Sequence, residues 1–253
     1  MDSILTLERA AAAHWRGTEE EWLGDWLLRA ADGFTGRANS ALPLGQPGMP
    51  LDDALAVLTR WYRDRELPPM IAVPAALDGD SAGRTLDDQL ASRGWQLRQA
   101  PAFFMTGDVP PAAVPAALPA GLEARADAAP DDAWLAAYHY RGLQDPPPVM
   151  RTVLTSAADQ AFISIRAAGS VLAIARLSVA AGWAGITAVE VSPARRRAGL
   201  GGALTREAFA QAASRGVDRV FLQVEVGNEN ARRLYERAGF RYSHRYHYRI
   251  GPA

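Results

Sequence analysis

One strand–turn–helix segment constrains the fold most. Residues 185–191 are apolar and predict a strand, Pro193 ends it, and residues 195–197 are three consecutive arginines. A glycine-rich turn at residues 199–202 then opens an amphipathic helix predicted over residues 203–215. The first N–H groups of a helix have no intrahelical partner, and the helix dipole favours negative charge there. The segment therefore predicts a site where backbone amides hold a phosphate or pyrophosphate beside arginines.

The spacing of these glycines excludes two common phosphate-binding fingerprints. A Rossmann turn needs Gly-x-Gly-x-x-Gly, and a P-loop needs Gly-Lys-Ser/Thr after its glycines. The chain instead has Arg-x-x-Gly-x-Gly, at Arg196, Gly199 and Gly201. Taken alone, the glycines fit equally well an ordinary strand–helix turn beside solvated arginines.

A second motif follows the helix. Residues 219–226 alternate and are β-branched, which predicts a strand. Asn228 then suits a helix N-cap, and Gly239 suits the left-handed position after the helix end. One face of the helix between them carries Ala231, Leu234 and Tyr235.

Together the two motifs resemble the GCN5-related N-acetyltransferases. In that family the first motif binds the pyrophosphate of acetyl-CoA, and Asn-x-x-Ala-x-x-Leu-Tyr-x-x-x-Gly-Phe follows at about this interval. The second pattern is matched here by Asn228, Ala231, Leu234, Tyr235, Gly239 and Phe240. The resemblance covers residues 120–249. It implies an α/β (α+β) fold with a mixed, mostly antiparallel sheet flanked by helices.

The resemblance also implies acetyl-CoA as a cosubstrate. In the family, the strand before the turn splays from its neighbour, and its exposed backbone pairs with the pantetheine arm. The residues placed against the coenzyme are Ala188, Val189, Val191, Arg196, Arg197, Ala198, Gly199, Leu200, Gly201, Gly202, Asn228 and Ala231.

Two side chains are candidates for the catalytic chemistry. Tyr235 matches the family's tyrosine that protonates the coenzyme sulfur, a role that suits a phenol because the thiolate has a similar pKa. Its alternative role is a core aromatic. Glu190 lies in an apolar strand and is the candidate general base, with pairing to residues 195–197 as the equally weighted alternative. Glu225 lies in the adjoining strand.

Composition narrows the remaining possibilities. The absence of cysteine excludes disulfides, thiolate metal sites and a cysteine nucleophile, and it agrees with a cytoplasmic location, as does an N-terminus without a signal core. A net charge of −1 gives no pull toward nucleic acid or membranes, and no apolar run approaches a membrane span. His244 and His247 are expected to face solvent or line a substrate cleft rather than bind metal, whereas His14 has no chemical context.

The chain divides at a Pro/Ala-rich linker, residues 108–120. The predicted domains are residues 1–107, a degenerate GNAT-like copy, and residues 121–253, the catalytic one, each with a mixed, mostly antiparallel sheet flanked by helices. The first half repeats the strand–helix–strand–helix–strand order of the second. Its segment in place of the phosphate turn, residues 44–51, contains two prolines, and Leu90 occupies the tyrosine position.

The first half also contains a predicted hairpin and many aromatic residues. The hairpin is predicted between residues 26–31 and residues 36–44. Five aromatic residues could form a core or an interface with the catalytic half, namely Trp22, Trp26, Phe34, Trp61 and Tyr62.

The sequence favours an acetyl-CoA-dependent N-acetyltransferase that transfers the acetyl group directly to a primary amine in a ternary complex. The amine would belong to a small molecule or to a peptide or protein N-terminus, and a homodimer is compatible with the pattern. A non-catalytic acyl-CoA sensor or scaffold is the alternative, although binding alone does not require the phenol of Tyr235. A nucleotide-binding domain of another class lacks its fingerprint.

Overall fold

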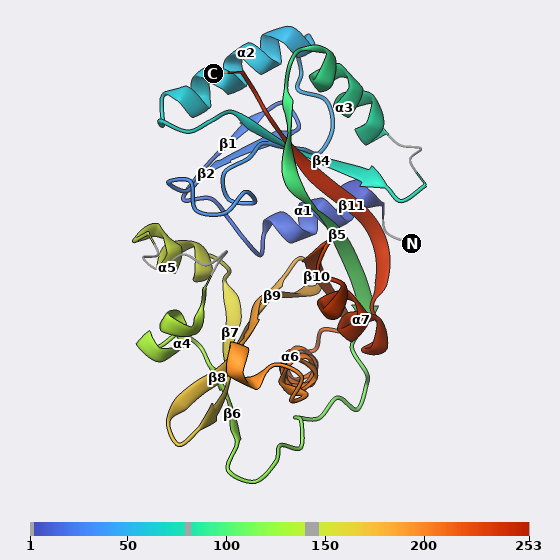
Figure 1. Ribbon diagram of the computed structural model, residues 1–253. Helices are drawn as coiled ribbons and strands as arrows, with labels where there is room; N and C mark the ends of the chain where they lie inside the picture. The colour runs from blue at the N-terminus through green and yellow to red at the C-terminus, as the bar shows by residue number, and fades with distance from the viewer. Residues whose placement is uncertain (1–2, 79–81, 140–146, 253) are drawn as a thin grey trace.

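The computed structural model describes residues 3–78, 82–139 and 147–252, and one eight-stranded sheet runs through it (Figure 1). Its order is β4-β11-β5-β10-β9-β8-β7-β6, and every neighbouring pair is antiparallel except β9 and β10. The predicted mixed, mostly antiparallel sheet flanked by helices is confirmed. The strands are β4 (Met70–Ala76), β5 (Gln96–Asp108), β6 (Glu123–Asp127), β7 (Asp159–Ala167), β8 (Ser170–Ala180), β9 (Trp183–Val191), β10 (Arg219–Glu225) and β11 (Arg241–Ile250).

Strands of the two chain halves interleave in this sheet. β5, from the N-terminal half, lies between β10 and β11, and β11 in turn lies between β5 and β4. In Figure 1, β5 and β11 run through the middle of the molecule and connect its upper and lower parts. The last strand is therefore an interior strand, buried by elements of the first half.

Helices cover both faces of the sheet. Alternate residues of a strand point to opposite faces. On β7, Phe162 packs with Trp134 of α4, whereas the next residue, Ile163, packs in the cluster that contains α6. The helices are α1 (Ile4–Ala12), α2 (Leu51–Arg63), α3 (Ala82–Ser92), α4 (Asp132–Ala137), α5 (Val149–Leu154), α6 (Leu200–Ser214) and α7 (Glu229–Arg237). No helix in the described ranges combines the length and the apolarity needed to cross a bilayer.

A small second sheet in the N-terminal half corrects the predicted hairpin. β2 (Trp26–Ala30) pairs over its whole length with β1 (Glu19–Leu23), and only a two-residue strand, β3 (Leu42–Pro43), lies on its other side. Most of residues 31–41 form a loop held by Asn39, whose amide donates to the carbonyls of Phe34 and Thr35. β1 was missed because its acidic run lacks apolar alternation.

The rest of the N-terminal half follows the predicted order, as β3, α2, β4, α3 and β5. Three of the five aromatic residues, Trp26, Trp61 and Tyr62, lie in one core with Leu90. Phe34 instead packs with side chains of α4 and α5, at the contact between the halves, and Trp22 is 52% exposed.

Residues 109–120 contain neither helix nor strand, as the composition predicts.

Candidate active site

The centre of the sheet opens where β9 and β10 diverge. These parallel strands pair only at Ala184–Val220, Gly185–Phe221 and Ile186–Leu222. Beyond that point β9 continues to Val191 without β10 beside it, which leaves backbone groups on that edge available. The predicted splay of the strand before the glycine turn is confirmed.

A bulge in β9 shapes the opening. Ala188 has φ +52°, and the register with β8 shifts between the pairs Arg176–Thr187 and Ile174–Glu190. Alanine in the left-handed region stores backbone strain, which is common at functional sites. Two further residues have a left-handed backbone, Ala100 of β5 (φ +70°) and Thr35 (φ +64°). Together with Ala188 they line one cleft.

This cleft has a volume of about 710 Å³ and is lined by both halves of the chain. The C-terminal half contributes nine of the predicted site residues: Ala188, Val189, Glu190, Val191, Arg196, Gly201, Asn228, Ala231 and Tyr235. The N-terminal half contributes residues that the sequence did not single out: Thr35, Gly36, Arg37, Arg98, Ala100 and Ala102. Further polar and aromatic side chains line the cleft, namely Tyr138, Gln223, Tyr246 and Tyr248.

The glycine turn lies at one end of the cleft. A single 3-10 turn, η2 (Pro193–Arg195), leads to Arg197 at φ +63° and Gly199 at φ +78°, and α6 begins at Leu200, three residues earlier than expected. Gly199 is the N-cap of α6 and provides no side-chain cap, so the first amides of the helix are left for an anion. Leu200 itself packs into the core, whereas Gly201 and Arg196 reach the cleft.

Replacing Gly199 with alanine is expected to weaken acetyl-CoA binding at least tenfold, about 1.4 kcal/mol. The added Cβ meets no atom within 4 Å, but φ +78° disfavours any side chain, so the turn would shift and carry the amides with it. Gly216, after the other end of α6, has φ +70° and equally open surroundings. The control Gly216→Ala should therefore lower stability by a similar amount and leave the Kd of acetyl-CoA, measured by calorimetry, unchanged. The same Kd in Gly199→Ala and Gly216→Ala would contradict a coenzyme site at this turn.

Tyr235 projects from α7 to the floor of the cleft. Asn228 caps this helix by accepting from the Ala231 N–H at 3.2 Å, and Gly239 (φ +95°) follows its end, as predicted. The Tyr235 ring is 6% exposed and packs edge-on against Phe240, with 5.7 Å between ring centroids. Burial raises the pKa of Tyr235 well above its ordinary value. The phenol is therefore protonated at neutral pH, but burial moves its pKa away from the match with a thiolate that suits a proton donor.

Glu190, on the splayed part of β9, has a partner that the sequence did not indicate. One carboxylate oxygen accepts from the backbone N–H of His139 at 3.0 Å, and the other lies 3.8 Å from His139 Nδ1. In the described ranges no arginine of residues 195–197 comes within ion-pair distance of Glu190, and of these arginines Arg196 acts on it through its charge. Burial raises the pKa of Glu190, opposed by the charges of His139 and Arg196.

His139 was missed because the helix was predicted to continue to residue 140, whereas α4 ends at Ala137.

The histidines of β11 do not face solvent or a cleft as expected. His244 is fully buried, with Nε2 2.8 Å from Glu8 Oε1 of α1. His247 Nε2 lies 2.6 Å from Asp87 Oδ1, which Arg249 also contacts. Because β11 is an interior strand of the shared sheet, helices of the N-terminal half cover these side chains.

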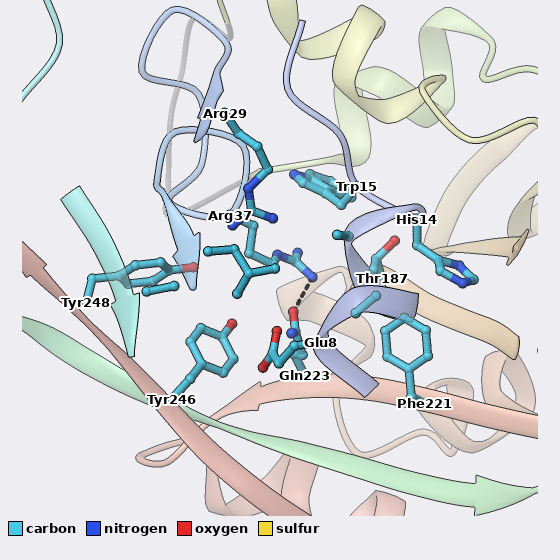
Figure 2. A pocket seen from close by; sticks show the side chains of 14 residues that line it. Glu8, His14, Trp15, Arg29, Arg37, Thr187, Phe221, Gln223, Tyr246 and Tyr248 are labelled. Carbon is cyan, nitrogen blue, oxygen red and sulfur yellow. Dashed lines mark hydrogen bonds between the residues drawn. The ribbon is translucent and has the colours of Figure 1, made fainter. Parts of the chain in front are cut away.

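The cleft shares five residues with a pocket of about 20 Å³, enough for one water molecule (Figure 2). The shared residues are Arg37, Thr187, Gln223, Tyr246 and Tyr248. Figure 2 shows Arg37 reaching Gln223 across this pocket, where its Nη1 donates to Gln223 Oε1 at 2.7 Å. The N-terminal half thus forms one wall of the cleft.

A splayed strand pair, an amide-rich glycine turn and a buried tyrosine at one cleft are the combination found in GCN5-related N-acetyltransferases. The family described as "Probable histone acetyltransferase Rv0428c C-terminal" matches residues 2–249. The probable histone acetyltransferase Rv0428c of Mycobacterium tuberculosis is 32% identical, over 99% of this chain and 74% of the relative. The uncharacterized N-acetyltransferase YobR of Bacillus subtilis is 26% identical, over 99% of each chain.

Structural comparison agrees. A GCN5-related N-acetyltransferase from Kribbella flavida shares the fold with a TM-score of 0.73, over 100% of this chain and 97% of its own, at 19% identity. The chain belongs to the family of the Rv0428c C-terminal region, within the GCN5-related N-acetyltransferases, and is an N-acetyltransferase.

Proposed function

We propose that the chain uses acetyl-CoA and transfers its acetyl group directly to a primary amine while both substrates are bound. The observation that carries this proposal is that one cleft is lined by Arg196 and Gly201 at the glycine turn, by the open edge of β9 and by Tyr235. Acetyl-CoA has one part for each of them: a pyrophosphate, a pantetheine arm and a thioester. Positioning two bound reactants supplies much of the rate in such a reaction.

In the proposed reaction the amine nitrogen attacks the thioester carbon, a C–N bond forms and the C–S bond breaks. Glu190 accepts the proton of the amine, which its position beside the open edge of β9 allows. Tyr235 donates its proton to the departing sulfur. Amides of α6 and the guanidinium of Arg196 would hold the pyrophosphate.

The test is to mix the full chain with acetyl-CoA and a panel of amines and to follow free thiol. The panel includes small amines, peptides with free N-termini and a lysine-rich histone peptide, since the M. tuberculosis relative is named a probable histone acetyltransferase. Amine-dependent thiol release supports the proposal. Acetyl-CoA binding without thiol release for any amine would favour a sensor or scaffold.

Glu190→Gln is expected to lower kcat/KM about tenfold, below the usual range for general bases because water can replace the carboxylate. Since burial raises the pKa of Glu190, the wild-type rate should climb with pH through a range above that of an ordinary glutamate. The variant should lose this rise. An unchanged pH–rate profile in Glu190→Gln would assign the base elsewhere.

We also propose that residues 1–107 and 121–253 are related units, of which only the second binds coenzyme. The segment of residues 44–51 contains Pro47 and Pro50, which lack N–H donors, and Leu90 is a fully buried core residue. Calorimetry of the full chain with acetyl-CoA should therefore give one site per chain. A stoichiometry of two would contradict this division.

A further inference from the structure

We infer that the acceptor amine carries a carboxylate, and that Arg37 and Arg98 bind it at the wall of the cleft formed by the N-terminal half. This inference rests on the proposed function. It names a substrate class, small amino carboxylates, and two residues that determine specificity.

Among the described residues, Arg37 contacts only neutral groups. Besides the bond to Gln223, its guanidinium carbon lies 4.6 Å from the ring centroid of Trp15. Gln223 lies one residue beyond the last β9–β10 pair, so Arg37 is beside the splay. A guanidinium has five donors, and one bond to Gln223 leaves most of them for a ligand.

Arg98 reaches the same cleft from β5. Its Nη1 lies 3.3 Å from the sulfur of Met70, and its guanidinium carbon is 5.6 Å from the ring centroid of Tyr248. A Cβ at Gly36 would lie only 2.8 Å from Arg98 Nη1, so the loop that carries Arg37 passes directly over Arg98. The Arg98 guanidinium thus lies against the backbone of the residue that precedes Arg37.

No carboxylate of the described ranges lies within ion-pair distance of either arginine. Elsewhere arginines do pair, for example Arg93 with Asp52 and Arg249 with Asp87. Glu8, the acidic residue of the adjoining small pocket, is held by His244 at 2.8 Å.

A third guanidinium adds positive charge behind this wall. Arg176 is fully buried, and its hydrogen bonds to described residues go to neutral groups, namely the carbonyls of Leu154 and His14 and the side chains of Thr187 and Gln160. Its guanidinium carbon lies 5.5 Å from the same Trp15 ring that Arg37 covers. Burying a charge without a counter-charge is expensive, so a bound anion would relieve this arrangement.

Charged groups of both signs therefore line the cleft. Glu190 and Glu225 lie along β9 and β10, Arg196 precedes the glycine turn, and Arg37 and Arg98 come from the N-terminal half. With Arg196 assigned to the pyrophosphate, a small molecule with both an ammonium and a carboxylate matches the remaining charges, with its amine toward Glu190 and its carboxylate toward Arg37 and Arg98. Guanidinium and carboxylate can form two parallel hydrogen bonds, which also orients the amine.

The experiment compares each amine as a carboxylate and as its carboxamide, with free thiol as the readout. The pairs are glycine and glycinamide, β-alanine and β-alaninamide, and L-phenylalanine and L-phenylalaninamide. We expect kcat/KM for the best carboxylate to exceed that of its amide at least tenfold. Spermidine and a lysine-rich histone peptide should be poorer acceptors.

Variants then locate the preference. Arg37→Gln and Arg98→Gln should each lower kcat/KM for the carboxylate at least tenfold, barely change it for the amide, and keep the Kd of acetyl-CoA. Arg37→Lys should retain part of the preference. Arg65 also stacks on an aromatic ring, with its guanidinium carbon 3.7 Å from the Trp61 centroid, but lies outside the cleft lining; Arg65→Gln is the matched control and should change nothing.

Amides, spermidine or the histone peptide as the best acceptors would overturn the inference and leave N-acetyl transfer intact. A carboxylate preference that survives both substitutions would overturn it too. If no amine releases thiol, the proposed function fails. Calorimetry with N-acetyl-L-phenylalanine and its amide then tests the carboxylate site independently of catalysis. Binding of the carboxylate that is lost in Arg37→Gln supports the site. Equal binding of both compounds contradicts it.

Discussion

Tyr235→Phe is expected to bind acetyl-CoA as tightly as the wild type and to turn over about a hundredfold more slowly, the lower end of the usual effect of a general acid. The ring remains, so its packing against Phe240 and the floor of the cleft are preserved. Only the proton for the departing sulfur is lost. Stopped-flow or steady-state thiol release from pH 6 to pH 9, with calorimetry for the coenzyme, measures both quantities.

Tyr62→Phe is the matched control for this variant. Tyr62 is also buried, but its hydroxyl donates to the Arg29 carbonyl at 3.1 Å and lies outside the cleft lining. Loss of the Tyr62 hydroxyl should lower the free energy of unfolding and leave kcat unchanged. A Tyr235→Phe enzyme with wild-type kcat across this pH range would make Tyr235 a core residue alone.

The sequence was sufficient for the parts of the site that local chemistry determines. The cap at Asn228 and the left-handed glycines 199 and 239 follow from motifs within a few residues of one another, whereas the open edge of β9 was implied by the family resemblance. The cap and the glycines depend on short-range hydrogen bonding or on backbone freedom, so a pattern of adjacent residues contains the information.

The arrangement of the halves is not encoded in that way. β5 pairs with both β10 and β11, and nothing in the local pattern of β11 reveals a neighbour so distant in sequence. Three features of the site depend on this interleaving or on residues at the ends of loops. They are the burial of His244, the contact of Glu190 with His139, and the arginines that line the cleft. Arg37 in particular lies in a loop whose shape depends on Asn39 rather than on a periodic pattern.

The same interleaving makes His14 a determinant of stability at low pH. His14 is 1% exposed and packs edge-on against Phe221, with 4.8 Å between ring centroids. Its Nε2 lies 3.1 Å from the Ala180 carbonyl, which can only accept, so Nε2 carries the proton and Nδ1 accepts from the Ser178 hydroxyl at 2.8 Å. This pairing uses the neutral ring.

Burial lowers the pKa of His14 from 6.5 to about 4, with the charge of Arg176 acting in the same direction. The unfolded chain therefore binds this proton more tightly than the folded one, and stability falls as pH decreases from about 6.5 toward 4. Between pH 7 and pH 5 the free energy of unfolding should drop by about 2 kcal/mol on account of this residue. Urea unfolding at the two pH values measures the drop.

His14→Gln supplies the comparison, because glutamine does not titrate. The variant is expected to be less stable than the wild type at pH 7, since its amide cannot reproduce both ring contacts, but its own loss between pH 7 and pH 5 should be smaller by about 2 kcal/mol. Subtracting the two losses removes the contribution of every other titrating group. Equal losses in the two proteins would show that the acid sensitivity arises from other groups than the ring held between Ser178 and Ala180.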